Sequence, residues 1–325
     1  MRTDLDHLPA SKQREINEVV QIVFEEFDKA IAVDAAGWKK KGRIHKIILY
    51  GSYARGNWVW EPHTKKGYRS DYDLLIIVNN KRVIENTSFP SELDKRFIRD
   101  LIDKRLRVPV QFIVHTLQEV NNALAQGRYF FMDAARDGVA IYQEDEKPLR
   151  QPVPRTPESA LAMAREYFAN WYPDAGEFYD DYKSNLERGR LKKSAFELNQ
   201  CVEQLYHTVL LVCTFYTPHV HNIGFLHTQA KKIDRRFVYV WPTDTRRQAA
   251  MFNKLKEAYV KARYSKHYRI SAEDLSWLGE QVQELSRVVE AVCSERIAAL
   301  ERDVASQATL EEATPASKRA SARAR

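Results

Sequence analysis

The sequence lacks the features of a membrane or secreted protein. None of its 325 residues falls in an apolar run near the ~18 residues that a membrane helix needs, and residues 1–15 have no apolar centre of the kind a signal peptide requires. Only three cysteines occur, far apart and in no Cys-x-x-Cys pair, which excludes a disulfide scaffold and a cysteine-based zinc site. We therefore expect a cytoplasmic protein without a membrane partner.

The sequence also has little charge of one sign outside its C-terminal end. The formal net charge is +7, and a large part comes from Lys318, Arg319, Arg323 and Arg325. Charge alone therefore gives little support for nucleic-acid binding. With 44% apolar and 29% charged residues, the chain can form sizeable folded cores.

Residues 1–145 mix helical and strand patterns. Apolar residues spaced by three and four predict a helix over 14–31. The other predicted elements are strands at 46–50, 74–78, 108–114 and 139–142, and helices at 92–106 and 116–125. The segment predicts an α/β domain with a mixed sheet.

The rest of the chain has no strand pattern. A proline-rich linker is predicted at 146–158, a helical bundle at 159–303 and a disordered basic tail at 304–325. The predicted helices cover 157–170, 174–188, 191–216, 222–235, 244–262 and 271–301. The whole chain is thus expected to be of the α+β class, with an all-α C-terminal half.

Two short motifs carry the chemistry of the first half. A strand ends at Gly51-Ser52 and turns into a helix, an arrangement whose backbone N–H groups suit phosphate. Asp71 and Asp73 stand two residues apart at the entrance of the next strand, so their side chains share one face. Two carboxylates beside a phosphate cradle form a site for magnesium. Alone, each motif is usually a loop or a solvated strand end.

The joint pattern Gly-Ser-x-Ala-Arg-Gly at 51–56 and Ser-Asp-x-Asp-Leu at 70–74 resembles the nucleotidyltransferases of the DNA polymerase β superfamily, in particular the minimal nucleotidyltransferases. The resemblance covers about residues 40–142. It implies that Asp71 and Asp73 are catalytic and bind Mg²⁺ or Mn²⁺.

The same resemblance implies that Gly51 and Ser52 contact the triphosphate of ATP or another nucleoside triphosphate, with Ser52 also a catalytic candidate and Ser70 a nucleotide-binding one. Arg55 is either a phosphate partner or a structural anchor.

The sequence departs from this family in two places. The insert 57–69 is longer than in the smallest members and is predicted to form a flap over the site. The family commonly has a third carboxylate on the next strand, where this sequence has Gln111. Because an amide cannot accept a proton as a general base, catalysis is less secure than binding. Glu61 and Glu92 are the alternative carboxylates, although no pattern places either in the site.

The helical half resembles the HEPN family, more particularly its sacsin-like members. The segments that carry the resemblance are 195–207, 218–222 and 262–271. HEPN ribonucleases have an arginine and a histidine separated by four to six residues, whereas three separate Arg263 from His267. Ribonuclease activity is therefore disfavoured.

A sacsin-like helical half implies nucleotide binding instead, with Arg263 and Lys266 as phosphate partners. Tyr264 and Tyr268 flank this segment. In related two-protein systems the nucleotidyltransferase is an antitoxin that adenylylates a tyrosine near the HEPN site, so the likeness implies that a fused chain could modify itself.

Four histidines, at positions 207, 219, 221 and 227, lie close together in the sequence. No acidic residue or cysteine stands at ligand spacing inside the loop, so a helix-capping turn is favoured over a metal site.

Three functions follow from these patterns. The first is magnesium-dependent transfer of a nucleoside monophosphate, AMP from ATP, to a hydroxyl on protein, RNA or a small molecule, in a toxin–antitoxin or defence context. The second is a nucleotide-binding sensor that has lost catalysis through Gln111. The third is a HEPN ribonuclease toxin. A homodimer formed through the helical domain is a further expectation.

Overall fold

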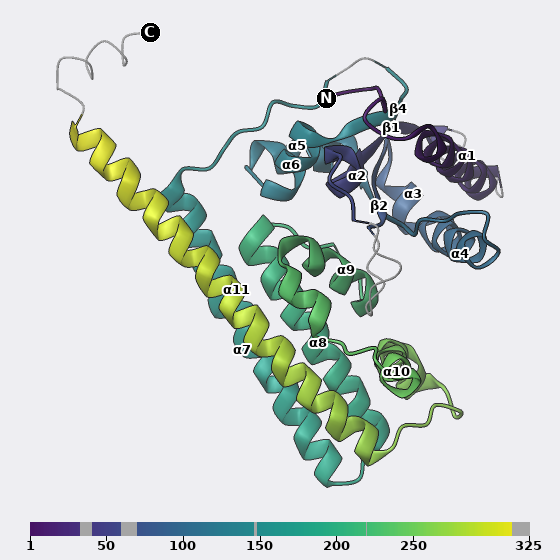
Figure 1. Cartoon of the computed structure of the whole chain (residues 1–325), viewed down its shortest axis with the longest axis vertical. Coiled ribbons are helices and arrows are strands. Elements are labelled where there is room, and N and C mark those ends of the chain that lie inside the picture. Colours follow the sequence, from purple (N-terminus) through teal and green to yellow (C-terminus); the bar gives the residue numbers. More distant parts are fainter. Residues whose placement is uncertain (33–40, 60–69, 146–147, 219, 314–325) are drawn as a thin grey trace. The chain divides into compact units, whose positions relative to one another are not determined.

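The chain forms two compact units, Met1–Pro154 and Arg155–Arg325, in the computed structural model (Figure 1). The structure describes all residues except 33–40, 60–69, 146–147, 219 and 314–325. The division between the units falls inside the segment predicted as a linker, whose last two residues already belong to the first helix of the second unit.

The first unit is built on a four-stranded sheet with the strand order β3-β2-β1-β4. The strands are β1 (Ile44–Tyr50), β2 (Tyr72–Val78), β3 (Val110–Thr116) and β4 (Val139–Gln143). β1 pairs antiparallel with both β2 and β4, while β2 and β3 are parallel. The predicted mixed sheet is therefore confirmed.

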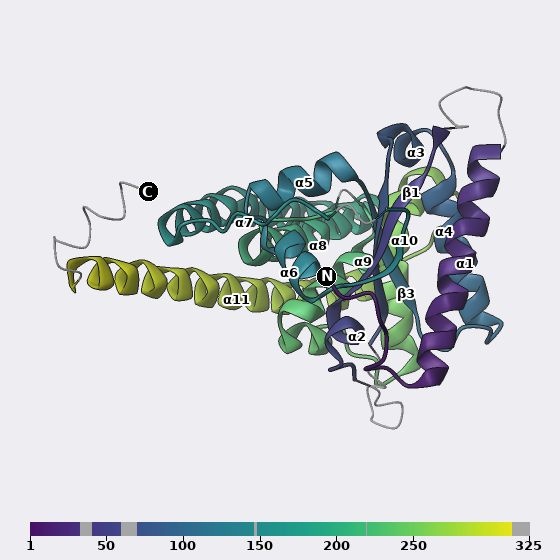
Figure 2. The ribbon, with the colours of Figure 1, turned by 90° about the horizontal axis from the view of Figure 1, so that it is seen from above.

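Helices cover both faces of this sheet. They are α1 (Ala10–Ala32), α2 (Gly51–Arg55), α3 (Lys81–Glu85), α4 (Phe89–Ile102), α5 (Leu117–Ala125) and α6 (Tyr129–Asp137). Figure 2 shows α1 and α4 on one side of the strands, and α5 and α6 contact the sheet from the other side. All of β2 is buried, as expected for a central strand with both faces covered. The sequence patterns did not predict α3 and α6.

The second unit is all-helical, as predicted. Its helices are α7 (Pro157–Glu187), α8 (Leu191–Thr214), α9 (Ile223–Ile233), α10 (Arg246–Tyr264) and α11 (Ala272–Ala313), with a short 3₁₀ turn η2 (Arg235–Tyr239). α8 packs against each of the four other α-helices, and most of its residues are buried (Figure 1). α8 is thus the central helix of the bundle.

α7 continues through Pro173, where the sequence predicted a break between two helices. Proline removes one backbone hydrogen bond and usually kinks or ends a helix. Here hydroxyls on α7 bind α11: Tyr172 lies 2.9 Å from Ser286 Oγ, and Tyr182 donates to the Leu275 carbonyl at 2.9 Å. Packing along the whole length of α7 therefore outweighs the local cost of the proline.

α11 extends to Ala313, so the prediction of disorder was wrong for residues 304–313. These residues are mostly Ala, Gln, Glu and Leu, which favour helix. Extending an existing helix adds one hydrogen bond per residue and avoids the cost of nucleation. The remainder of the predicted tail, 314–325, lies outside the described residues.

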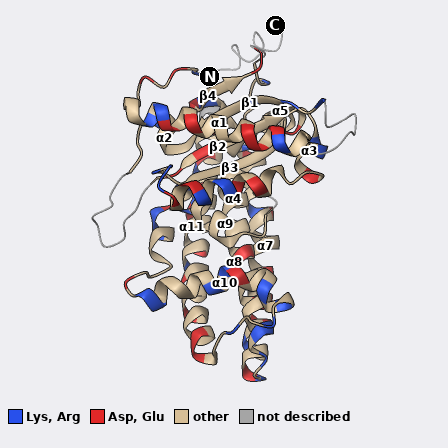
Figure 3. Ribbon diagram, turned by 90° about the vertical axis from the view of Figure 1, so that its right-hand side faces the viewer, with Lys and Arg blue, Asp and Glu red and all other residues tan. Residues whose placement is uncertain are grey.

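Basic and acidic residues are interspersed over the ribbon (Figure 3), in agreement with the weak charge signal of the sequence. In the described part of the chain, none of the helices has the length and apolar character that crossing a membrane demands.

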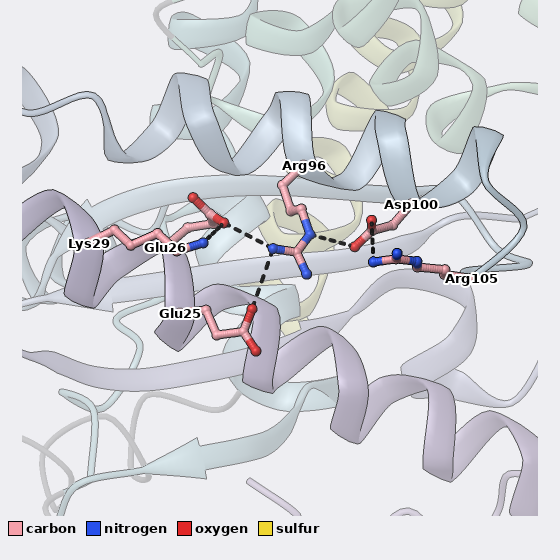
Figure 4. Close-up of polar contacts among 6 residues, drawn as sticks. All are labelled: Glu25, Glu26, Lys29, Arg96, Asp100 and Arg105. Atoms are coloured by element: carbon pink, nitrogen blue, oxygen red, sulfur yellow. Dashed lines mark hydrogen bonds and ion pairs between the residues drawn. The ribbon is translucent and has the colours of Figure 1, made fainter.

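A buried ion-pair network fastens α4 to α1 (Figure 4). Arg96 on α4 bonds Asp100 at 2.7 Å through Nε and reaches Glu26 and Glu25 on α1 at 3.2 and 3.4 Å through Nη1. Asp100 is only 1% exposed. Arg105 reaches this carboxylate only at 3.8 Å, so Asp100 depends mainly on Arg96 for compensation.

Replacing Arg96 with alanine should destabilise the first unit by about 3 kcal/mol, because the buried carboxylates of Asp100 and Glu26 lose the cation that they share. Asp100 then keeps only the more distant Arg105, and Glu26 keeps only the exposed Lys29. Denaturant unfolding measures the change. Lys95→Ala is the matched control, since Lys95 pairs with Glu92 on the exposed side of the same helix and should cost well under ~1 kcal/mol. Equal losses in the two variants would contradict the role given to Arg96.

Candidate functional site

Three residues from three adjacent strands lie side by side where β1 ends and β2 and β3 begin. Tyr50 of β1 pairs with Asp73 of β2, and Asp73 pairs with Gln111 of β3. Residues in register on neighbouring strands point to the same face of a sheet. Asp73 is 2% exposed, whereas Gln111 is half-buried. The register therefore places Gln111 next to the Asp73 carboxylate, the relation expected of the third-carboxylate position.

Gly51 lies directly against the Asp73 carboxylate. It follows Tyr50, begins α2 and has a φ of +76°, a conformation that favours glycine. A Cβ at this position would stand 2.5 Å from Asp73 Oδ2, closer than any real contact allows. The backbone of the Gly51-Ser52 turn thus approaches the carboxylate so closely that only glycine fits.

Asp71 lies just before β2, two residues from Asp73, and is partly buried. Burial, the charge of Glu15 and the charge of Asp71 together raise the pKa of the Tyr53 hydroxyl. Asp71 therefore lies close to α2, which carries Tyr53. Both predicted carboxylates and the Gly-Ser turn meet at one end of the sheet.

Ser52 and Ser70 have different surroundings. Ser52 is half-buried in the first turn of α2, beside Gly51. Ser70 is buried, its hydroxyl accepts from the Val59 N–H at 2.9 Å, and its own N–H donates to the Val59 carbonyl. Ser70 thus closes the base of the insert. The predicted flap falls largely on residues 60–69, Glu61 among them, which lie outside the described residues.

Arg55 lies near the acidic residues of α6. Burial raises the pKa of Asp133, and the charges of Arg136 and Arg55 oppose this. The Arg136 hydrogen bond lowers the pKa of Asp137, with smaller contributions from Arg55 and Arg2. Arg55 is itself exposed, and its two predicted roles, structural anchor and phosphate partner, both stay predictions.

Glu15 on α1 is hydrogen-bonded to the residues at the starts of β2 and β3. No sequence motif identified it as part of the site. It is 9% exposed. Its carboxylate accepts from the Tyr72 hydroxyl at 3.0 Å and from the N–H groups of Arg107 and Val108 at 2.5 and 3.1 Å. It therefore connects the starts of β2 and β3. The sequence signal was an acidic residue on the apolar stripe of a helix, four residues before Val19.

The residues present fit a divalent cation bound with a nucleotide. Asp71 and Asp73 supply hard oxygen ligands, and the glycine-lined approach beside Asp73 leaves no room for a side chain. Among the residues with described positions, no group of three His, Cys, Asp or Glu is arranged to hold a metal ion alone. Phosphate oxygens of the nucleotide would supply further ligands to a cation held by Asp71 and Asp73. Glu92 is not part of the site, since it pairs with Lys95 on the exposed side of α4.

In the helical unit, Arg263 and His267 have separate surroundings. The Arg263 guanidinium lies 4.4 Å from the Tyr259 ring centre and 4.9 Å from that of Phe196. His267 is exposed, and its backbone N–H donates to Ser265. Lys266 is exposed as well. The predicted Arg–His pair therefore shares no described contact.

The two tyrosines that flank this segment differ in access. Tyr268 is 5% exposed and donates its hydroxyl to the Lys254 carbonyl at 3.1 Å. Tyr264 is 77% exposed. Of these two tyrosines, Tyr264 is therefore the one whose side chain is accessible to a modifying group.

A different histidine contacts the same aromatic ring as Arg263. His221 stacks on Tyr259 with ring centres 4.5 Å apart, and its Nδ1 lies 2.9 Å from Glu203 Oε1 on α8. His207 Nε2 lies 3.7 Å from the same oxygen. Burial raises the pKa of Glu203, but the two histidines outweigh it and the net shift is downward. The spacing of the histidines in the loop did not predict this grouping, because their partner Glu203 lies on α8.

Comparisons with known proteins match these two units separately. The model of the nucleotidyltransferase domain family matches residues 33–129, and the model of the HEPN domain family matches residues 168–295. A search of the curated proteins finds no match. The first match contains β1, α2, β2 and β3, which form the site at Asp73, and the second contains α8, α9 and α10. The chain therefore carries a nucleotidyltransferase domain followed by a HEPN domain.

Proposed function

We propose that the first unit transfers a nucleoside monophosphate, AMP from ATP, to a hydroxyl group on protein, RNA or a small molecule. The observation that carries the proposal is the contact of the Gly51 backbone with the Asp73 carboxylate, with Gln111 in register beside it. A phosphate cradle and a carboxylate pair at one sheet end suit a triphosphate with its metal ion.

Each residue of the site has a role in this reaction. The Gly51-Ser52 turn binds the phosphates through N–H groups and the Ser52 hydroxyl. Asp71 and Asp73 hold Mg²⁺ or Mn²⁺, which neutralises charge on the transferring phosphoryl group when it is bound. Burial fixes Asp73, so its carboxylate is already oriented before nucleotide arrives. The acceptor, the toxin–antitoxin or defence context, the cytoplasmic location and the homodimer stay predictions.

Gln111 determines how fast the transfer proceeds. The acceptor oxygen must lose its proton as it attacks the α-phosphorus and pyrophosphate leaves. An amide accepts no proton, so Gln111 orients groups by hydrogen bonds and the proton passes to solvent. Slow turnover follows, and a site that has lost turnover altogether would act as a nucleotide-binding sensor.

A second candidate function, RNA cleavage by the helical unit, is supported by the grouping of His221 with Arg263 on Tyr259. Glu203 accepts the Nδ1 proton of His221, which leaves Nε2 for proton transfer. Arg263 supplies a cation for the phosphodiester. In this proposal His221 replaces His267 as the histidine.

Asp71→Asn with Asp73→Asn should abolish the metal-dependent part of triphosphate binding, because the ligand charge is no longer compensated. Titration calorimetry with and without Mg²⁺ measures this. Asp103→Asn, at an exposed acid beyond α4, is the control and should bind normally. Unchanged metal-dependent affinity in the double variant would contradict the assignment of Asp71 and Asp73 as metal ligands.

Gln111→Asp should raise the rate of pyrophosphate release by about 10²-fold or more, the contribution of a general base. Wild type and Asp71→Asn are compared under the same conditions. If wild type turns over rapidly and Gln111→Asp abolishes turnover, Gln111 does not occupy the base position.

His221→Ala should remove any RNA cleavage by the wild-type protein, whereas His267→Ala should leave it intact. The measurement is cleavage of an end-labelled RNA, and circular dichroism verifies that both variants are folded. Loss of cleavage in His267→Ala alone would restore the pair expected from the sequence. An inactive wild type would remove this second function.

A further inference from the structure

An arm formed by residues 2–8 contacts the short helix α2 at the end opposite to its phosphate-binding turn. The arm is fixed at both of its own ends. Ala140 at the edge of the sheet donates its N–H to the Arg2 carbonyl at 2.8 Å, and Leu8 is buried in the core. The side chains between these two points therefore have defined positions.

Two side chains of the arm donate to carbonyls of α2. Arg2 Nη2 donates to the Ala54 carbonyl at 2.5 Å, and His7 Nε2 lies 2.8 Å from the Tyr53 carbonyl. A carbonyl oxygen only accepts, so His7 Nε2 carries the proton. The last carbonyls of a helix have no partners within it. The Gly56 N–H reaches the Tyr53 carbonyl only at 3.4 Å, so the arm supplies the closer donor there and a donor to the Ala54 carbonyl as well.

The other end of α2 allows little movement. Gly51 lies against Asp73 so closely that a Cβ would be 2.5 Å from Oδ2. Between the two ends, the buried Tyr53 ring stacks on Trp58 with centres 5.3 Å apart. A shift of Tyr53 or Ala54 would thus move the N–H groups of the turn relative to the carboxylate.

We infer that Arg2 and His7 are positioning residues for the Gly51-Ser52 turn. By holding the carbonyls of Tyr53 and Ala54, they fix the distance between the turn and the Asp73 carboxylate, and with it the affinity for a triphosphate. This inference rests on the proposed nucleotidyltransferase function. Arg2 and His7 act through the carbonyls of α2 and not by contact with the nucleotide.

The first test does not depend on nucleotide. In full-length protein, Arg2→Ala with His7→Leu should speed hydrogen exchange of the amides of 51–57 about tenfold or more, the scale of a lost hydrogen bond to a charged group. Exchange in β1 and β2 should not change. Asp4→Ala, at an exposed arm residue whose carboxylate accepts from Asp6 N–H, is the control. Unchanged exchange at 51–57, or equal acceleration throughout the unit, would overturn the inference.

The second test measures ATP binding with Mg²⁺. The double variant should bind about tenfold more weakly, with its AMP affinity unchanged. Arg2→Lys with His7→Gln should restore ATP affinity, because both replacements keep a donor at these carbonyls. Failure of this pair to restore binding would contradict a positioning role. If wild type binds no triphosphate, the proposed function fails, and the exchange result at 51–57 still decides whether the arm orders the turn.

Discussion

The contact between the Gly51 backbone and the Asp73 carboxylate is the constraint on which the site depends. It requires a residue without a side chain, a positive φ and a buried carboxylate at the start of a central strand. Because β1 and β2 are antiparallel, the end of one strand and the start of the next meet at this point. The N–H groups of the Gly51-Ser52 turn and the Asp73 carboxylate are thereby brought together, although the insert 57–69 separates them in the sequence.

Residues distant in sequence keep this contact in place. Glu15 on α1 binds the Tyr72 hydroxyl and the backbone that leads into β3, so one buried carboxylate sets the starts of two strands. Arg96 fastens α4 to α1 on the same side of the sheet. Arg2 and His7 hold α2 from the other end. These contacts hold the short Gly51-Ser52 turn in place from several sides, as a preorganised site requires.

The sequence predicted the elements with strong local patterns. The strands around Gly51 and Asp73 and the helical second half needed only apolar runs and periodicity. The mixed sheet was expected of the nucleotidyltransferase domain, because apolar runs do not give the direction in which strands pair. The sequence missed features that depend on tertiary contacts: Glu15 on the apolar stripe of α1, the continuation of α7 through Pro173, and the pairing of His221 with Glu203. Arg263 and His267 are close in sequence, yet packing on Phe196 and Tyr259 directs the guanidinium elsewhere. Sequence spacing alone did not contain that information.

The most direct measurement follows the two ends of the triphosphate separately. The full-length protein is incubated with Mg²⁺ and ATP labelled at either the α- or the γ-phosphate, together with candidate hydroxyl acceptors, its own Tyr264 included. Nucleotidyl transfer predicts that the α-label becomes bound to the acceptor while the γ-label leaves as pyrophosphate, and that Asp73→Asn shows neither. Transfer of the γ-label to an acceptor, or release of the γ-label as orthophosphate, would contradict the account.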